Sequence, residues 1–157
     1  SYSYYFSKYP HCWGWATWRR SWQYYQGDIK FWKKWSTSVG WKNNIPDVVE
    51  RRYWENIFNK IHEGKIDSWA YPWQCCLWHY GGLTATPNVN LVSNIGFGSD
   101  STHTSYADSP LSKMATSSIG EINHPELIEQ HIKADRYVFD YIYGGRSFRL
   151  PYSLLKK

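Results

Sequence analysis

Two tryptophans and a nearby carboxylate are the side chains whose types and spacing could do chemistry. Trp69 and Trp73 lie four residues apart, and Asp67 comes two residues before the first of them. The C–H face of a sugar packs well on a flat aromatic ring, and a carboxylate can accept a proton from a hydroxyl group. Core packing explains the two tryptophans equally well, and a helix N-cap explains Asp67. The segment is therefore a candidate sugar site or an ordinary helix start.

Polar side chains elsewhere in the chain could hold hydroxyl or phosphate groups. Asn88, Asn90 and Asn94 offer amide donors and acceptors for sugar hydroxyls, although asparagine is also a common turn residue. His103 lies between two threonines, where an imidazole could complete a metal site, contact a diphosphate or simply face solvent. The guanidinium of Arg19 matches the oxygens of a diphosphate, and a solvated helix face is the alternative interpretation.

The composition indicates one folded domain that spans residues 1–157. Hydrophobic residues make up 42% of the chain and charged residues 20%, as in ordinary globular proteins.

The net charge of +5 favours an anionic partner, yet the basic residues form no stripe, which argues against nucleic-acid binding. No stretch approaches the roughly 18 apolar residues of a transmembrane segment. The three cysteines have no CxxC spacing, which favours a reducing, cytoplasmic setting.

Helical patterns dominate the first half of the chain. The spacing of Trp15, Trp18 and Trp22 predicts a helix within residues 12–22 whose aromatic face packs in the core. A proline in the first turn and a glycine at the end predict a second helix over residues 46–64. The apolar residues of this second helix recur every four positions, at Val49, Tyr53, Ile57 and Ile61.

Two further helices and a few strands complete the expected α+β fold, which has about three main helices. One helix should run over residues 67–82, with Trp73, Leu77 and Trp78 facing inward. The other should begin at Pro125 and end at Gly144, with Ile128, Ile132, Phe139 and Ile142 on one side. Extended segments are expected at residues 2–9, 83–87 and 89–92, a mobile loop at 99–118 and a loosely docked tail at 146–157.

Three strings in the sequence resemble a known family. They are Pro-His-Cys-Trp-Gly-Trp-Ala-Thr-Trp-Arg-Arg at 10–20, Lys-Ile-Asp-Ser-Trp-Ala-Tyr-Pro-Trp at 65–73, and Pro-Asn-Val-Asn-Leu-Val-Ser-Asn-Ile-Gly-Phe-Gly at 87–98, followed by Thr-His-Thr at 102–104. In order and spacing they are similar to the back half of bacterial nucleotide-diphospho-sugar transferases, also called hemolytic-protein-like glycosyltransferases. The resemblance covers roughly residues 2–105 and implies the acceptor-side half of a GT-A domain.

The resemblance implies an inverting transfer from a nucleotide-diphosphate sugar to a hydroxyl acceptor. The family places its general base directly after Trp69, where this chain has Ala70, so activity is either lost or carried by Asp67. In a complete enzyme an Asp-x-Asp in the front half holds Mn²⁺ or Mg²⁺ on the diphosphate, and this chain contains no Asp-x-Asp. The resemblance therefore predicts an acceptor-binding half that is incomplete or inactive alone, which leaves open whether the chain is an enzyme.

Two other interpretations remain open. A non-catalytic carbohydrate-binding module would use the tryptophans as sugar platforms without any chemistry, and Ala70 is compatible with it. An aromatic-rich interaction domain would pair with a donor-binding half to rebuild the site. Because a missing half would leave an apolar face uncovered, we also expect the chain to form homodimers or to pair with such a partner.

Overall fold

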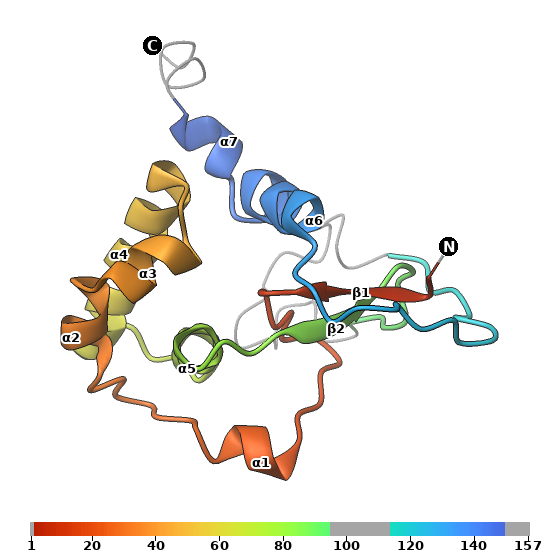
Figure 1. Cartoon of the computed structure of the whole chain (residues 1–157), viewed down its shortest axis with the longest axis horizontal. Helices are drawn as coiled ribbons and strands as arrows, with labels where there is room; N and C mark the ends of the chain where they lie inside the picture. The colour runs from red at the N-terminus through yellow and green to blue at the C-terminus, as the bar shows by residue number, and fades with distance from the viewer. Residues whose placement is uncertain (1, 95–113, 150–157) are drawn as a thin grey trace, which may run out of the picture.

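The computed structural model describes residues 2–94 and 114–149, and it has the α+β class expected from the sequence (Figure 1). The main helices are α4 (Val48–His62), α5 (Ala70–His79) and α6 (Ile132–Tyr137), the last of which continues as a π-helical stretch (Val138–Ile142). The sheet consists of β1 (Tyr4–Ser7) and β2 (Thr84–Pro87). Shorter helices are α1 (Arg19–Trp22), α2 (Trp32–Ser36), α3 (Val39–Asn44) and α7 (Gly145–Phe148). Within these residues no helix has the length and apolar character needed to cross a membrane.

Strand β1 has hydrogen-bonded neighbours on both sides. Strand β2 runs antiparallel to it, with Phe6 opposite Ala85. On the other side, the Ser3 amide donates to the Asn123 carbonyl at 2.9 Å, and the His131 amide donates to the Phe6 carbonyl at 2.8 Å. The segment that leads into α6 therefore satisfies the β1 edge that β2 leaves open.

Helix α4 was predicted, but it begins at Val48, so Pro46 lies just before the helix and not in its first turn. The Asp47 carboxylate accepts hydrogen bonds from the amides of Val49 and Glu50 at 2.9 and 3.2 Å, which is a helix N-cap. The buried face lies one position beyond the predicted stripe, because Trp54 and Phe58 have the larger apolar areas and take the centre of the core. The residues predicted to face inward and found only partly buried at the edge of the core are Val49, Tyr53 and Ile57.

Aromatic rings form most of the core between α2, α3, α4 and α5. Trp32, Trp41, Trp54 and Phe58 are completely buried, and Trp78 of α5 is 3% exposed. Their rings meet mainly edge to face, as between Trp32 and Trp41, whose centroids are 4.9 Å apart at 88°. Such packing accounts for much of the high aromatic content of the chain. Helix α5 was correctly predicted to turn both of its later tryptophans inward.

The helix predicted within residues 12–22 is mostly absent. Only Arg19–Trp22 is helical, and Trp18 and Trp22 are 68% and 41% exposed, so they do not form a core face. Gly14 has a φ of +61°, a left-handed conformation that prevents a right-handed helix from passing through it. The spacing of the three tryptophans was therefore misleading, because the backbone that carries them is largely irregular.

The last predicted helix begins seven residues late, at Ile132 instead of Pro125. The residues before it form the backbone bonds to β1 described above, which are incompatible with helix. Ile128, Ile132 and Ile142 are 76%, 72% and 62% exposed, so the predicted apolar face is not buried, although Phe139 is. Pairing with β1 thus overrides the local signal.

The predicted mobile loop at 99–118 and tail at 146–157 lie only partly within the described residues. Ser117, from the end of the loop, donates its amide to the Asn90 carbonyl at 2.9 Å. Arg149, from the start of the tail, pairs with Asp47 at 2.8 Å and with Asp140 at 3.2 Å. These two described portions are therefore docked on the rest of the chain.

Candidate functional site

The described parts of the three resembling segments, which for the third are residues 87–94, come together in space. The Trp15 ring stacks on Trp69 with a centroid distance of 5.0 Å and an interplanar angle of 22°, and it lies 6.0 Å from the Trp73 ring. Gly14 packs so closely against Val92 that a Cβ atom on this residue would overlap the valine side chain. Strings that are separate in the sequence thus form one continuous region.

Five aromatic rings make up what we call the aromatic surface: Trp15, Trp22, Tyr25, Trp69 and Trp73. Trp22 stacks on Tyr25 with centroids 4.5 Å apart and planes 5° apart. Trp73 is only 3% exposed and lies beneath the others, 5.1 Å from Trp22 and 6.4 Å from Tyr25. Trp73 is therefore the floor of this surface, which fits core packing better than direct ligand contact.

Trp69 offers the most accessible ring of the five. One face rests on Trp15, and no other aromatic ring of residues 2–94 and 114–149 contacts it. Trp69 is 45% exposed. Trp22 is nearly as exposed, but Tyr25 stacks on it while Trp15 and Trp73 lie against it at 5.9 and 5.1 Å. The second face of Trp69 is thus the best platform for a flat apolar partner.

The predicted base positions lie at the start of α5, beside this platform. Ala70 is the first residue of the helix, and its methyl group cannot accept a proton. Asp67 is exposed and has no hydrogen-bond partner among the described residues. The Ser68 hydroxyl accepts a hydrogen bond from the Tyr71 amide at 3.5 Å, so Ser68 provides the side-chain cap expected here. Asp67 is therefore not occupied as a helix cap.

The three candidate asparagines have different surroundings. The Asn88 side-chain amide donates to the Tyr2 carbonyl at 2.7 Å. The Asn90 side chain donates to the Ala115 carbonyl at 3.0 Å and accepts from the Val92 amide at 3.3 Å. Both side chains are therefore engaged in hydrogen bonds to backbone groups. Asn94 instead lines a pocket of about 390 Å³ together with residues 12–14, next to the aromatic segment.

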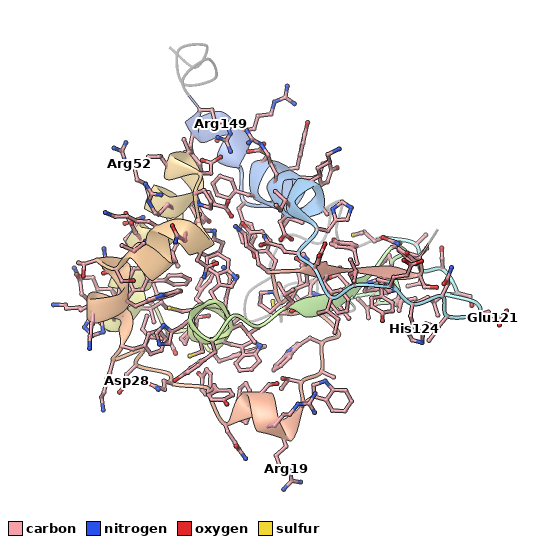
Figure 2. The ribbon with its side chains drawn as sticks, in the orientation of Figure 1. Arg19, Asp28, Arg52, Glu121, His124 and Arg149 are labelled. Carbon is pink, nitrogen blue, oxygen red and sulfur yellow. The ribbon has the colours of Figure 1, made fainter. Side chains whose placement is uncertain are left out.

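Arg19 and His103 are not brought to the aromatic surface by anything the structure describes. Figure 2 shows Arg19 on the outer side of α1, pointing away from α5. The residue is exposed. His103 lies outside the described residues, so its predicted contact with a metal or a diphosphate stays a prediction.

The sequence patterns did not identify the whole surface. They assigned Trp15 and Trp22 to the core and did not select Tyr25. The sequence feature that could have indicated an exposed surface was Gly14. A glycine between two tryptophans suggests an irregular backbone, in which the two rings need not face the core together.

The ionisable groups next to Tyr25 are held neutral by burial. Burial raises the pKa of Cys76 to about 11 and also raises the pKa of Tyr25, so both stay neutral at neutral pH. Cys12, Cys75 and Cys76 are all free thiols. Within the part of the chain that the structure describes, no group of three or more His, Cys, Asp or Glu side chains is placed to hold a metal ion.

No family model matches the sequence, and no characterised protein or solved structure is similar enough to count as a relative. The functional argument therefore depends on the geometry of the aromatic surface and on the resemblance of the three strings.

Proposed function

We propose that the aromatic surface binds the carbohydrate acceptor of an inverting nucleotide-sugar glycosyltransferase, and that the chain is the acceptor-side half of its GT-A domain. The observation that carries this proposal is the convergence of the resembling strings on one exposed platform, with Trp69 stacked on Trp15. A sugar ring packs its C–H face on such a platform while its hydroxyl groups remain available to polar neighbours. Asn94 lines a pocket that also includes Gly14, the residue directly before Trp15.

The missing carboxylate at position 70 limits what the chain can do alone. Sugar transfer requires a base within hydrogen-bond reach of the acceptor hydroxyl, and Asp67 lies about one helical turn before Ala70. A displacement of about 5 Å would spoil a near-attack geometry. We therefore propose that this chain binds an acceptor without transferring a sugar by itself. The nucleotide diphosphate and its Mn²⁺ or Mg²⁺ would be held by a donor-binding half, in a cytoplasmic setting.

The decisive experiment is a saccharide titration of the full chain, followed by tryptophan fluorescence. We expect mono- and oligosaccharides to change the emission, and Trp69→Ala to weaken binding about tenfold or more. Tyr137→Ala is the matched control, because Tyr137 is 60% exposed and stacks on Tyr141 at 4.5 Å, on a different part of the fold. If the two variants bind equally well, the aromatic surface is not the sugar site.

A non-catalytic carbohydrate-binding module is the second candidate function, and Ala70 favours it. Titration with UDP or GDP in the presence of Mn²⁺ separates the two candidates. In a transferase half, millimolar nucleotide should still perturb the Trp69 signal, because the donor diphosphate lies next to the acceptor even though the donor-binding half supplies most of its affinity. A binding module should respond to saccharide and ignore nucleotide.

Pairing with a donor-binding half or with a second copy is the expected consequence of an incomplete domain. Large apolar side chains such as Leu127, Ile128 and Ile132 are 63%, 76% and 72% exposed, which supports association. Sedimentation velocity at several concentrations should show a dimer, and a strictly monomeric chain would count against the fragment interpretation.

A further inference from the structure

A cluster of buried polar side chains lies at the end of β1, away from the aromatic surface. Ser7 is completely buried, while Lys8, Glu50 and Asp135 are 6%, 7% and 2% exposed. Charged side chains are rarely buried to this extent unless they are paired, so each partner matters. In Figure 1, α6 and the end of β1 lie above α5, whereas α1 lies below it.

Asp135 has a structural role that uses both of its oxygen atoms. Oδ1 accepts from the Ser7 hydroxyl at 2.5 Å. Oδ2 accepts from the Gln130 side-chain amide at 2.7 Å and from the Lys8 backbone amide at 3.1 Å. Three donors thus satisfy this carboxylate and fasten α6 to the end of β1. Asp135 has little remaining capacity to bind anything else.

Lys8 and Glu50 form a pair that is only partly satisfied. Lys8 Nζ lies 2.7 Å from Glu50 Oε1, which also accepts from the Tyr9 hydroxyl. Glu50 Oε2 has no donor among the described residues. An ammonium group has three N–H donors, and Glu50 is the one acceptor that the described residues provide for Lys8 Nζ. The acceptor Glu50 Oε2 and the remaining N–H donors of Lys8 Nζ are therefore both available to a ligand.

These unused groups line a pocket of about 530 Å³, which we call the polar pocket. Its size falls within the roughly 300–1,000 Å³ of small-molecule sites. Asn43 and Ile132 lie at its exposed rim, and Asp47 and Arg136, which are 3.8 Å apart, also line it. Lys8 is paired with Glu50, and Asp47 with Arg136 and Arg149. The third carboxylate of the lining, Asp135, already accepts from three donors. An added ionic group would leave a charge uncompensated in partly desolvated surroundings.

We propose that the polar pocket binds a neutral polyhydroxyl molecule, such as an uncharged hexose or a cyclitol. A hydroxyl group both accepts and donates, so one hydroxyl can accept from Lys8 Nζ while it or its neighbour donates to Glu50 Oε2. The side-chain amide of Asn43, at the rim, contacts a further hydroxyl. Trp78 reports on occupancy, since its indole N–H donates to the Lys8 carbonyl at 2.7 Å and its ring lies 5.3 Å from Lys8 Nζ.

The test is an NMR titration of the full chain that follows the indole N–H signal of Trp78. Glucose, galactose, mannose and myo-inositol are the neutral probes, and glucosamine and glucuronate are the cationic and anionic ones at neutral pH. At least one neutral probe should shift the signal, and the charged derivatives should bind about tenfold more weakly. If no neutral probe shifts the signal, or if a charged hexose binds as well as its neutral counterpart, the proposal is wrong.

Variants at the polar pocket and at the aromatic surface distinguish binding at this pocket from binding at the proposed acceptor site. Asn43→Leu, at an exposed position, should weaken the neutral probe about tenfold without unfolding the chain. The double variant Lys8→Met/Glu50→Gln, checked for folding by circular dichroism, should abolish the Trp78 shift. Trp69→Ala should leave that shift intact even where it removes saccharide binding at the aromatic surface. If Trp69→Ala eliminates the Trp78 shift, the signal comes from the aromatic surface and no separate pocket exists.

Discussion

The aromatic surface and the polar pocket differ in how their residues are distributed along the chain. The aromatic surface is built from two short segments, residues 15–25 and 69–73. The polar pocket combines Lys8, Glu50 and Asp135, which are separated by dozens of residues and come from the end of β1, from α4 and from α6. Sequence patterns can draw attention to the first kind of site, because its residues are neighbours. They are silent about the second kind, which exists only after long-range packing.

The two regions also differ in the physics of their contacts. Ring packing at the aromatic surface is weakly directional, so the loss of one ring leaves the others in place. The buried pair of Lys8 and Glu50 depends on both members, because removing one leaves an uncompensated charge. We therefore expect single changes to be costly at the polar pocket and milder at the aromatic surface.

The largest expected effect is that of Lys8→Met. The change leaves the buried Glu50 carboxylate without its cationic partner and should reduce the free energy of unfolding by about 3–5 kcal/mol. Lys8→Met/Glu50→Gln, which removes both charges, should be considerably more stable than the single variant. Urea unfolding measures both. Equal stability of the single and the double variant would show that the pair is not coupled as the structure indicates.

Trp15→Ala should have a smaller effect, because it removes one ring that contacts Trp69, Trp22 and Trp73. Aromatic pairs contribute about 0.5–1.5 kcal/mol each beyond the buried area, so we expect a loss of about 2 kcal/mol in unfolding free energy. Trp18→Ala is the control, since this ring is 68% exposed and its removal should cost less than about 0.5 kcal/mol. A loss at Trp15 as large as that of Lys8→Met would contradict the contrast between the two regions.

A pH series distinguishes the regions by their charges. Burial acts to raise the pKa of Asp47, but hydrogen bonds from Arg149 and from the amides of Glu50 and Val49 outweigh it, so the pKa is lowered in the folded chain. The stability from this group is present above its unfolded pKa and is lost as the pH falls through the folded one. Asp47→Asn keeps a capping side chain and should cost about 0.5 kcal/mol at neutral pH.

The same series carried out with Trp15→Ala provides the control. The cost of Asp47→Asn should shrink as the pH falls below the usual range of aspartate, while the cost of Trp15→Ala stays constant over the same range. Urea unfolding at several pH values gives both results. A Trp15→Ala cost that follows the pH would mean that charge contributes to the aromatic surface.

Ala70→Asp should have an effect as small as that of Asp47→Asn, but in the stabilising direction. Helix α5 has no acidic residue in its first turn, and a carboxylate there should interact favourably with the helix dipole by about 0.3–1 kcal/mol. Thermal unfolding should show a slightly higher midpoint, with Ala70→Asn as the uncharged control. A lower midpoint than that of the control would mean that position 70 does not accept a charge. If it does, this variant also places a proton acceptor beside Trp69.

The elements that the sequence predicted well have strong local signals at their ends. Asp47 caps α4 with its carboxylate, and Gly81, with a φ of +70°, ends the α5 region. The segment at 12–22 was predicted as helix from apolar spacing alone, and the segment at 125–131 from Pro125 and apolar spacing. A left-handed Gly14 and the backbone bonds to β1 overrode that spacing.

Local chemistry along the chain was sufficient to indicate an α+β fold rich in helix and to select Trp69 and its neighbours as a place of interest. Long-range packing determined the rest: which tryptophan faces solvent, that Gly14 meets Val92, and that Lys8 lies against Glu50. The reason is physical. Caps, turns and periodicity act over a few residues, whereas burial depends on surfaces that meet only when distant segments compete for the same core.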